Sequence, residues 1–271
     1  MGKHASLGQG LYGGATQVGQ ALGLLVTPLL LPYFGWRGCF LFWGLLSASS
    51  VIVWLFVNDG QEVHQPAKID VKAAVRSPSV WTLGLSHLGT FGLGAAISAW
   101  LTVYLIDQYH LPLALAAALG SFALLTGMFF RPLGGILIGR GIVGAIPLLR
   151  MGTITGAVGV AILMIPIAAP ILAIIGISLI AVGSTIPYTS VFNSAANLQS
   201  VRKGVAQGFV SMVSSPTAII APPVIGYLLD HTKSFTYAFG SILLFSAVAI
   251  TASFLAGPAV KRESIVLQAQ T

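Results

Sequence analysis

The stretch PILAIIGISLIAVGSTIPYTSVF, residues 170–192, contains no charged side chain and is rich in aliphatic residues. A helix needs about 20 apolar residues to cross a hydrocarbon core roughly 30 Å thick, because it rises about 1.5 Å per residue. This stretch is long enough. It therefore predicts a membrane-spanning helix, and the rest of the chain repeats the pattern.

The composition extends this prediction to the whole chain. Of the 271 residues, 56% are hydrophobic and 7% are charged, whereas a soluble domain has about 25% charged residues. We therefore predict an integral membrane protein, which excludes soluble enzymes. The net charge of +7 does not indicate a nucleic-acid partner, because the basic residues stand singly or in pairs between apolar runs. The single cysteine, Cys39, excludes an internal disulfide.

Apolar stretches of spanning length follow one another along the chain. They cover about 10–33, 38–57, 80–105, 113–138, 148–167, 170–192, 205–229 and 235–257. We predict an all-α polytopic bundle of about eight spanning helices. Two lie in residues 1–57 and six in residues 80–257, with a polar linker at 58–79 and a polar tail at 258–271. Within the tail, we expect residues 261–271 to be disordered.

The basic residues give the orientation. With the N-terminus in the cytoplasm and the stretches alternating sides, only Arg37 and Lys233 lie outside. The inner side then holds Lys3, Lys68, Lys72, Arg76, Arg131, Arg140, Arg150, Arg202, Lys203, Lys261 and Arg262. Lys and Arg are enriched in cytoplasmic loops. Both termini, the linker and the tail are therefore predicted to be cytoplasmic.

Three stretches resemble the major facilitator superfamily of secondary transporters. Gly-Trp-Arg-x-x-Phe at 35–40 is similar to the family's loop between helices five and six. Arg-Pro-Leu-Gly-Gly at 131–135, with Arg140, resembles its loop between helices eight and nine, although the usual acid is Gly139 here. Ile-Ile-Ala-Pro-Pro-Val-Ile-Gly at 219–226 is similar to its eleventh helix.

The resemblance places the eight stretches in register with helices five to twelve of that fold, so it implies that helices one to four are absent. It implies a permease that moves a small solute, with or without protons, by alternating access around a site near the bilayer midplane. A non-transporting membrane protein, or an inert fragment of a truncated transporter gene, stays an alternative because of the absent helices. The expected location is a bacterial plasma membrane, the cell inner membrane.

No catalytic constellation is visible. The sequence has no His-Glu-x-x-His, no Gly-x-Ser-x-Gly and no P-loop. We therefore predict that the protein is not an enzyme, and we expect no cofactor and no metal site. The expected partners are a small solute, the lipid bilayer and, as an open possibility, protons and a missing set of N-terminal helices.

Polar residues inside apolar stretches are costly in lipid, so each needs a structural or functional reason. The candidates for lining a substrate cavity are Gln17, Gln20, His87, Trp100, Tyr188 and Asn193. Structural roles are the alternatives: helix-to-helix hydrogen bonds, a buried histidine, an interfacial aromatic belt, or helix capping. We expect His87 to be the only ionisable group well inside a stretch, so proton coupling would depend on it.

Arg131, Gly135 and Arg140 are candidates for a gating loop at the cytoplasmic end of the 113–138 stretch. An arginine there can bond helix carbonyls and hold two helices together in one conformation. Plain positive-inside charge is the alternative for both arginines, and contact with an anionic substrate is a further option for Arg131.

Glycine pairs mark helix packing on the first stretch. Gly10/Gly14 and Gly19/Gly23 are both Gly-x-x-x-Gly patterns, which let backbones approach closely in membranes. They predict two close-contact patches. The start of this stretch is weakly similar to the start of the seventh, because Gln9-Gly10 opens the first and Gln207-Gly208 opens the seventh.

Overall fold

A computed structural model describes residues 3–56, 71–167 and 169–268. This part of the chain is helical and contains no strand. The helices are α1 Lys3–Trp54, α2 Val71–Arg76, α3 Pro78–His87, the π-helix η1 Leu88–Gly92, α4 Leu93–Tyr109, α5 Leu113–Gly139, α6 Ala145–Leu163, α7 Pro170–Thr185, α8 Tyr188–Ala196, α9 Lys203–Thr232 and α10 Phe235–Gln268.

The described residues form seven helical runs that are long and apolar enough to cross a membrane. The first, Ser6–Trp54, has 49 residues, more than twice the length that one crossing needs. It bends at Gly35, whose φ of 60° and ψ of 177° suit glycine because it lacks a Cβ. The bend divides α1 into two spans, which are the first two of the predicted stretches.

Two of the predicted spans are interrupted. The third is α3, η1 and α4 in succession, so a π-turn at Leu88–Gly92 lies where an unbroken helix was expected. The sixth is α7 followed by α8, with Pro187 preceding Tyr188 at the break. Such irregular backbone within a span is tolerated where it is enclosed in protein or lines a cavity, and π-turns are frequent at functional sites.

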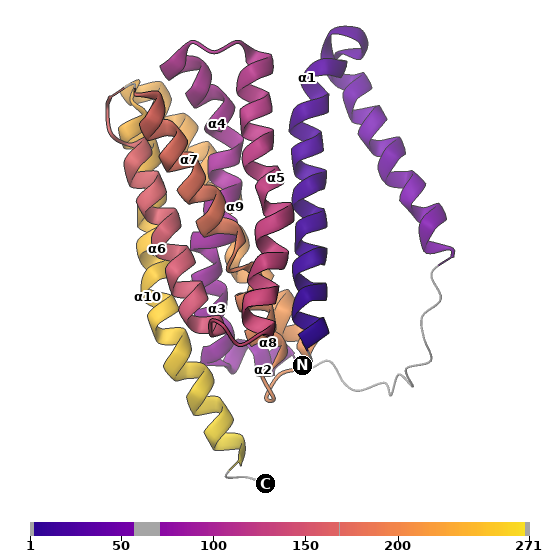
Figure 1. The fold of residues 1–271 in the computed structure, drawn as a ribbon, viewed down its shortest axis with the longest axis vertical. Helices are drawn as coiled ribbons and strands as arrows, with labels where there is room; N and C mark the ends of the chain where they lie inside the picture. Colours follow the sequence, from indigo (N-terminus) through magenta and orange to yellow (C-terminus); the bar gives the residue numbers. More distant parts are fainter. Residues whose placement is uncertain (1–2, 57–70, 168, 269–271) are drawn as a thin grey trace.

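The expected disorder of residues 261–271 is wrong for most of that segment, because α10 continues to Gln268. Residues 57–70, most of the predicted linker, and residues 269–271 lie outside the described part of the chain. The helix α2 occupies the end of that linker. Helix α1 begins and α10 ends at the same end of the bundle (Figure 1), which we call the terminal end.

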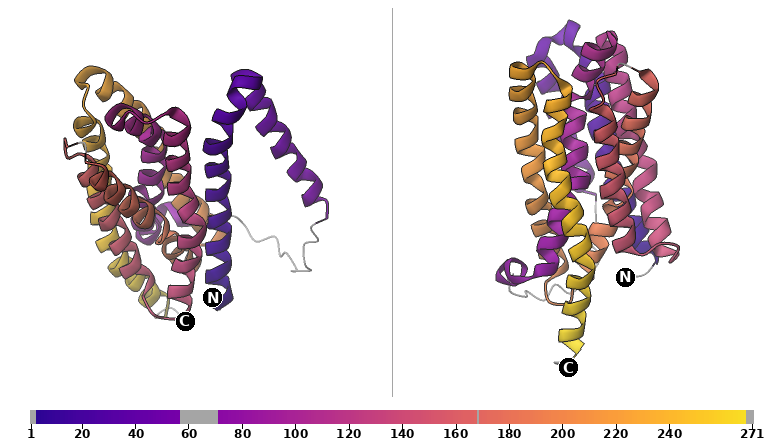
Figure 2. Two further views of the ribbon diagram at one scale, coloured as in Figure 1. Left: turned by 45° about the horizontal axis from the view of Figure 1, so that its top comes forward. Right: turned by 90° about the vertical axis from the view of Figure 1, so that its left-hand side faces the viewer.

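The helices from α3 to α10 pack into one bundle, and the first half of α1 runs beside α5 (Figure 1). Its second half stands away from the bundle in both Figure 1 and the left view of Figure 2. It is joined to the first half near the bend, where Trp43 Nε1 donates a hydrogen bond to Thr27 Oγ1 at 2.9 Å. Most of its side chains are apolar and exposed, with Phe40 74% accessible, as suits a helix surrounded by lipid.

The two glycine pairs of α1 differ in their surroundings. A Cβ on Gly10 would lie 2.7 Å from the carbonyl oxygen of Arg131, and one on Gly14 would lie 3.2 Å from that of Met128. Gly19 and Gly23 have nothing within 4 Å of the same position. The first pair therefore brings the backbones of α1 and α5 together, while the second makes no such contact.

Candidate functional site

Arg131 is the centre of the site. It lies well inside α5 rather than in a loop, and its side chain is only 3% exposed. Nη1 donates hydrogen bonds to the Gly13 carbonyl oxygen at 2.6 Å and to Thr16 Oγ1 at 2.9 Å. These bonds tie the guanidinium of α5 to α1, and the close approach at Gly10 makes them possible.

Tyr188 holds the guanidinium from the other side. It is the first residue of α8, directly after the break at Pro187. The Arg131 Cζ atom lies 4.2 Å from the centre of the Tyr188 ring, a cation–π arrangement. Thr189 Oγ1 also donates a hydrogen bond to the Arg131 carbonyl oxygen at 3.2 Å. The break in the sixth span therefore places an aromatic face on the arginine.

Arg131 keeps one donor without a partner. Its Nε is buried and makes no hydrogen bond. The acids among the described residues are Asp107 near the end of α4, Asp230 near the end of α9, and Glu263 in α10, and none of them pairs with it. A buried charge is costly unless it is paired and hydrogen-bonded. An anion that accepted a hydrogen bond from Nε would therefore stabilise the buried guanidinium.

A cavity of about 460 Å³ opens beside this group. Its walls come from α1, η1, α5, α8 and α9, together with the last residue of α3. The lining residues are Gln9, Tyr12, Thr16, Gln20, His87, Phe91, Arg131, Tyr188, Phe192, Gln207, Gly208, Ser211, Ser214 and Ser215. Hydroxyl, amide and aromatic groups surround one positive charge.

Three of the six predicted cavity residues meet here, namely Gln20, His87 and Tyr188. His87 is buried and its Nδ1 lies 2.6 Å from Thr90 Oγ1. Its ring packs against Phe91 and Phe192. We expected His87 to be the only ionisable group well inside a span; Arg131 is a second one. Gln17 is buried beside Gly127 and lines smaller spaces next to this cavity.

The other two predicted cavity residues lie elsewhere. Trp100 donates a hydrogen bond from Nε1 to the Pro222 carbonyl oxygen at 3.0 Å, which joins α4 to α9. Asn193 donates from Nδ2 to Ser6 Oγ at 2.7 Å, and its Oδ1 is buried without a partner. Asn193 therefore joins α8 to the start of α1 at the terminal end.

The remaining gating candidates also lie toward the terminal end. Arg140 caps the C-terminus of α5. A Cβ on Gly135 would come within 3.1 Å of the Ser6 carbonyl carbon, so this glycine allows α5 to touch the start of α1. Gly135 and the Asn193–Ser6 hydrogen bond thus lie where α1 meets α5 and α8.

Apart from Gln20, sequence reasoning did not assign the polar residues of α1 and α9 to the cavity wall. On α1, Gln9, Tyr12, Thr16 and Gln20 recur at intervals of three or four residues. On α9, Ser211 follows Gln207 by four residues, and Ser214 and Ser215 follow Ser211 by three and four. This spacing puts each set on one helix face. The three serines also bond to their own helix, as Ser211 Oγ does to the Gln207 carbonyl oxygen at 3.0 Å. The similarity of Gln9-Gly10 to Gln207-Gly208 was the available signal.

Among the described residues, no group of three or more His, Cys, Asp or Glu side chains is placed to hold a metal ion. The chemistry that the site offers is the binding of an anion by a guanidinium, with hydroxyl and amide groups around it.

Comparison with known proteins identifies the family. Residues 2–215 match the Major Facilitator Superfamily. The chain belongs to this superfamily. It is an integral membrane protein of a family of transporters and not of enzymes. The superfamily fold agrees with the crystal structure of a bacterial homologue of the human lysosomal transporter Spinster, in an inward-facing and occupied conformation. That match has a TM-score of 0.62 and 14% identity, and it covers 96% of this chain and 68% of that one.

Superfamily members with similar sequences include transporters of nitrogen oxyanions. The chain is 25% identical over 246 residues to a probable nitrate transporter, NarT, of Staphylococcus epidermidis. It is 26% identical over 249 residues to a nitrite extrusion protein of Bacillus subtilis. These matches cover 90% and 91% of this chain but 62% and 61% of the relatives. The chain thus spans about three fifths of their length.

Proposed function

We propose that this protein binds a small monovalent oxyanion of the nitrate or nitrite class at Arg131 and moves it across the membrane by alternating access. The observation that carries the proposal is the buried Arg131 guanidinium, whose Nε–H has no partner and which no described carboxylate neutralises. A guanidinium offers parallel N–H donors that match a planar oxyanion. Since the site has one buried cation, a single negative charge balances it.

The names of the relatives agree with this chemistry. They include the nitrate transporters, the nitrite extrusion protein and a probable nitrate/nitrite antiporter, NarK1, of Thermus thermophilus. For such anions, the Tyr188 ring would cover the face of the guanidinium and leave its edge for the substrate. His87 lines the same cavity, so coupling to protons would depend on whether the bound anion favours protonation of this ring.

Movement would take place between α1 and the bundle. We propose that the chain is divided as the sequence predicts: two helices in residues 1–57, a linker at 58–79, a six-helix bundle in residues 80–257 and a tail at 258–271. The linker, the tail and the terminal end would lie in the cytoplasm of a bacterium. Contacts at Gly135 and between Ser6 and Asn193 would close the terminal end. Opening would separate α1 from α5 and α8, and the Arg131 bonds to Gly13 and Thr16 would break or be exchanged for the substrate.

The test is uptake by proteoliposomes containing the full chain. Internal ¹⁵N-nitrate would be measured by mass spectrometry after dilution and washing, with nitrite, sulfate and a neutral sugar as competitors. The proposal predicts uptake that nitrite inhibits and the sugar does not, and its loss in Arg131→Gln. Arg150→Gln, which removes an arginine outside the cavity, is the matched control. Equal uptake by wild type and Arg131→Gln would overturn the proposal.

A non-transporting role is the second candidate. It is favoured by the position of the second half of α1, which does not pack against the bundle (Figure 1). Only the first half of α1 packs along the bundle, and the second half is joined to the first near the bend. Nitrate binding that depends on Arg131, without uptake in the same preparation, would support this candidate over transport.

A further inference from the structure

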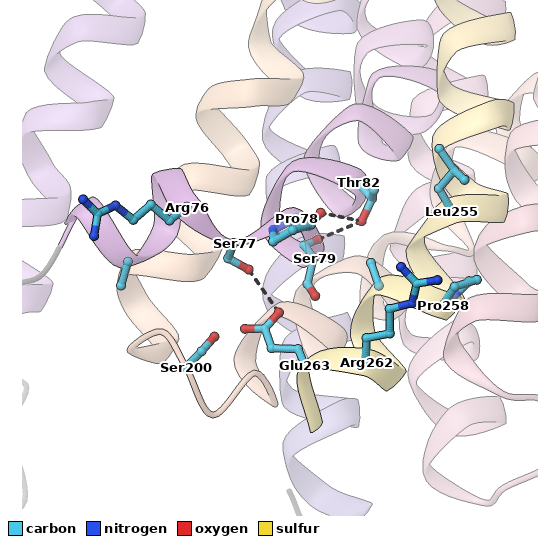
Figure 3. Close-up of a pocket in the computed structure, with 12 residues that line it drawn as sticks. Arg76, Ser77, Pro78, Ser79, Thr82, Ser200, Leu255, Pro258, Arg262 and Glu263 are labelled. Atoms are coloured by element: carbon cyan, nitrogen blue, oxygen red, sulfur yellow. Dashed lines mark hydrogen bonds between the residues drawn. The ribbon is translucent and has the colours of Figure 1, made fainter. Parts of the chain in front are cut away.

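A second pocket lies at the terminal end and shares no lining residue with the Arg131 cavity. It has a volume of about 860 Å³ and lies between the start of α3 and the last turns of α10 (Figure 3). The lining residues are Ala73, Arg76, Ser77, Pro78, Ser79, Thr82, Ser200, Leu255, Pro258, Ala259, Arg262 and Glu263. None of them belongs to the site described above.

Two buried polar atoms in this pocket have no partner. Ser79 is 0% exposed, and its Oγ makes no hydrogen bond. Glu263 accepts a hydrogen bond at Oε2 from Ser77 Oγ at 3.1 Å, while its Oε1 is buried and unpaired. Buried polar atoms are nearly always satisfied, so the pair points to a ligand that supplies both a donor and an acceptor.

The charges around these atoms have opposite signs on opposite sides. Figure 3 shows Ser79 between the Glu263 carboxylate and the Arg262 guanidinium, with Arg76 extending away from all three. The Arg262 side chain is exposed. The pocket thus presents a cation and an anion with a hydroxyl between them, which suits a molecule that carries both charges rather than a simple anion.

The residues around the pocket are of the kinds found at a membrane interface. The neighbouring helix α2 exposes Val71 and Val75 beside the basic residues Lys72 and Arg76. Trp81, 40% exposed, donates a hydrogen bond from Nε1 to the Val75 carbonyl oxygen at 2.9 Å. Exposed tryptophan and short segments of mixed basic and apolar residues are typical of the headgroup region.

We propose that this pocket binds the headgroup of a phospholipid that carries a phosphate and a primary ammonium. The phosphate would accept hydrogen bonds from Arg262 and Ser79, and the ammonium would donate to Glu263 Oε1. Exposed Leu255, with Pro258 and Ala259 beside it, gives the acyl chains an apolar path along α10 toward the spanning part of that helix.

The test is native mass spectrometry of the full chain with defined dioleoyl lipids. Phosphatidylethanolamine, phosphatidylcholine and phosphatidylglycerol would be offered in turn. Choline has no N–H donor and the glycerol headgroup has no cation, so the proposal predicts retention of phosphatidylethanolamine about tenfold above either, as expected for one charge-assisted hydrogen bond. Glu263→Gln, which keeps an acceptor for Ser77, should reduce this preference to about onefold. Lys203→Gln, a charge change outside the pocket, should leave it intact.

Equal retention of the three lipids by the wild-type chain would overturn the proposal without any variant. A preference for phosphatidylethanolamine that survives in both Glu263→Gln and Ser79→Ala would overturn the assignment of the site. Competition with soluble phosphoethanolamine distinguishes a lipid headgroup from a free phosphoamine as the ligand. Displacement of the lipid only at a large excess supports a lipid site, whereas displacement at equal concentration overturns the lipid in favour of a free phosphoamine.

Discussion

Arg131 and Arg150 are both arginines inside helices of the bundle, yet their partners differ. Arg150 of α6 donates from Nε to the Ser253 carbonyl oxygen at 3.1 Å and from Nη2 to that of Phe254 at 3.2 Å. Its guanidinium also lies over the Phe254 ring at 4.8 Å. Arg131 has the same kinds of partner, two oxygens and an aromatic face, but its Nε is unpaired and it lines the central cavity.

The comparison separates two uses of arginine in a membrane bundle. At Arg150 the charge is accommodated by backbone carbonyls of α10, so it joins two neighbouring helices. At Arg131 similar contacts orient the side chain but leave one edge of the guanidinium available. On the proposed function, the burial of Arg131 and its unpaired donor would distinguish it as the binding residue from the half-buried Arg150, which packs two helices.

Changing Arg131 to Lys tests the role of guanidinium geometry. Lys keeps the charge but has no planar set of donors, so one ammonium cannot bond Gly13, Thr16 and an oxyanion in the same way. We expect nitrate affinity to fall by about 30-fold, or roughly 2 kcal/mol, as measured by equilibrium binding in detergent. Unchanged affinity would mean that charge alone suffices.

Adding a methyl group at Gly10 tests the contact that positions Arg131. Gly10→Ala puts a Cβ 2.7 Å from the Arg131 carbonyl oxygen, and overpacking of this kind costs about 1–3 kcal/mol. We expect a lower midpoint of thermal unfolding and weaker nitrate binding. Gly19→Ala is the matched control on the same helix, where the methyl group meets nothing within 4 Å. Equal effects of the two substitutions would rule out the α1–α5 contact.

Substituting Arg150 tests whether this arginine contributes to helix packing rather than to nitrate binding. Arg150→Gln loses bonds to the Ser253 and Phe254 carbonyl oxygens, so we expect a loss of stability of about 1 kcal/mol. Nitrate affinity should remain within about twofold of the wild-type value, well below a tenfold change of 1.4 kcal/mol. Thermal unfolding and binding would be measured on one preparation, and a large loss of binding with unchanged stability would reverse the two roles.

Removing the aromatic ring of Tyr188 should have the smallest effect on nitrate affinity. Tyr188→Leu removes the cation–π contact with Arg131, worth about 2 kcal/mol when desolvated. Because this contact is present both with and without the bound anion, nitrate affinity should fall only about threefold, roughly 0.7 kcal/mol. Tyr188→Phe keeps the ring and should bind like the wild type. If Tyr188→Phe binds nitrate as weakly as Tyr188→Leu, the hydroxyl of Tyr188 rather than its ring face contributes to binding.

The spans could be predicted from the sequence because lipid imposes a length and an apolar composition on each of them. The breaks could not. Leu88–Gly92 and Ile186–Pro187 lie inside apolar stretches, and their departure from regular helix depends on how neighbouring helices pack. The helical continuation of α10 to Gln268 was also missed, because a polar composition there was taken to indicate disorder.

The site was only partly predictable for a related reason. An arginine near the end of an apolar stretch resembles ordinary positive-inside charge, so Arg131 was assigned to a loop. Its depth follows from the continuation of α5 to Gly139 and from Gly10, which lets α1 approach. Trp100 and Asn193 satisfied the same polarity criterion as Gln20 and Tyr188, but the helix face that each occupies depends on tertiary packing.

Anion binding at Arg131 is tested most directly by isothermal titration of nitrate into the purified wild-type chain and into Arg131→Gln, with Arg150→Gln in parallel. We expect one site per chain in wild type and Arg150→Gln, competition by nitrite, and at least about 100-fold weaker binding in Arg131→Gln, the loss of roughly 3 kcal/mol. Nitrate binding of equal strength in Arg131→Gln, with the protein folded, would contradict anion binding at this residue.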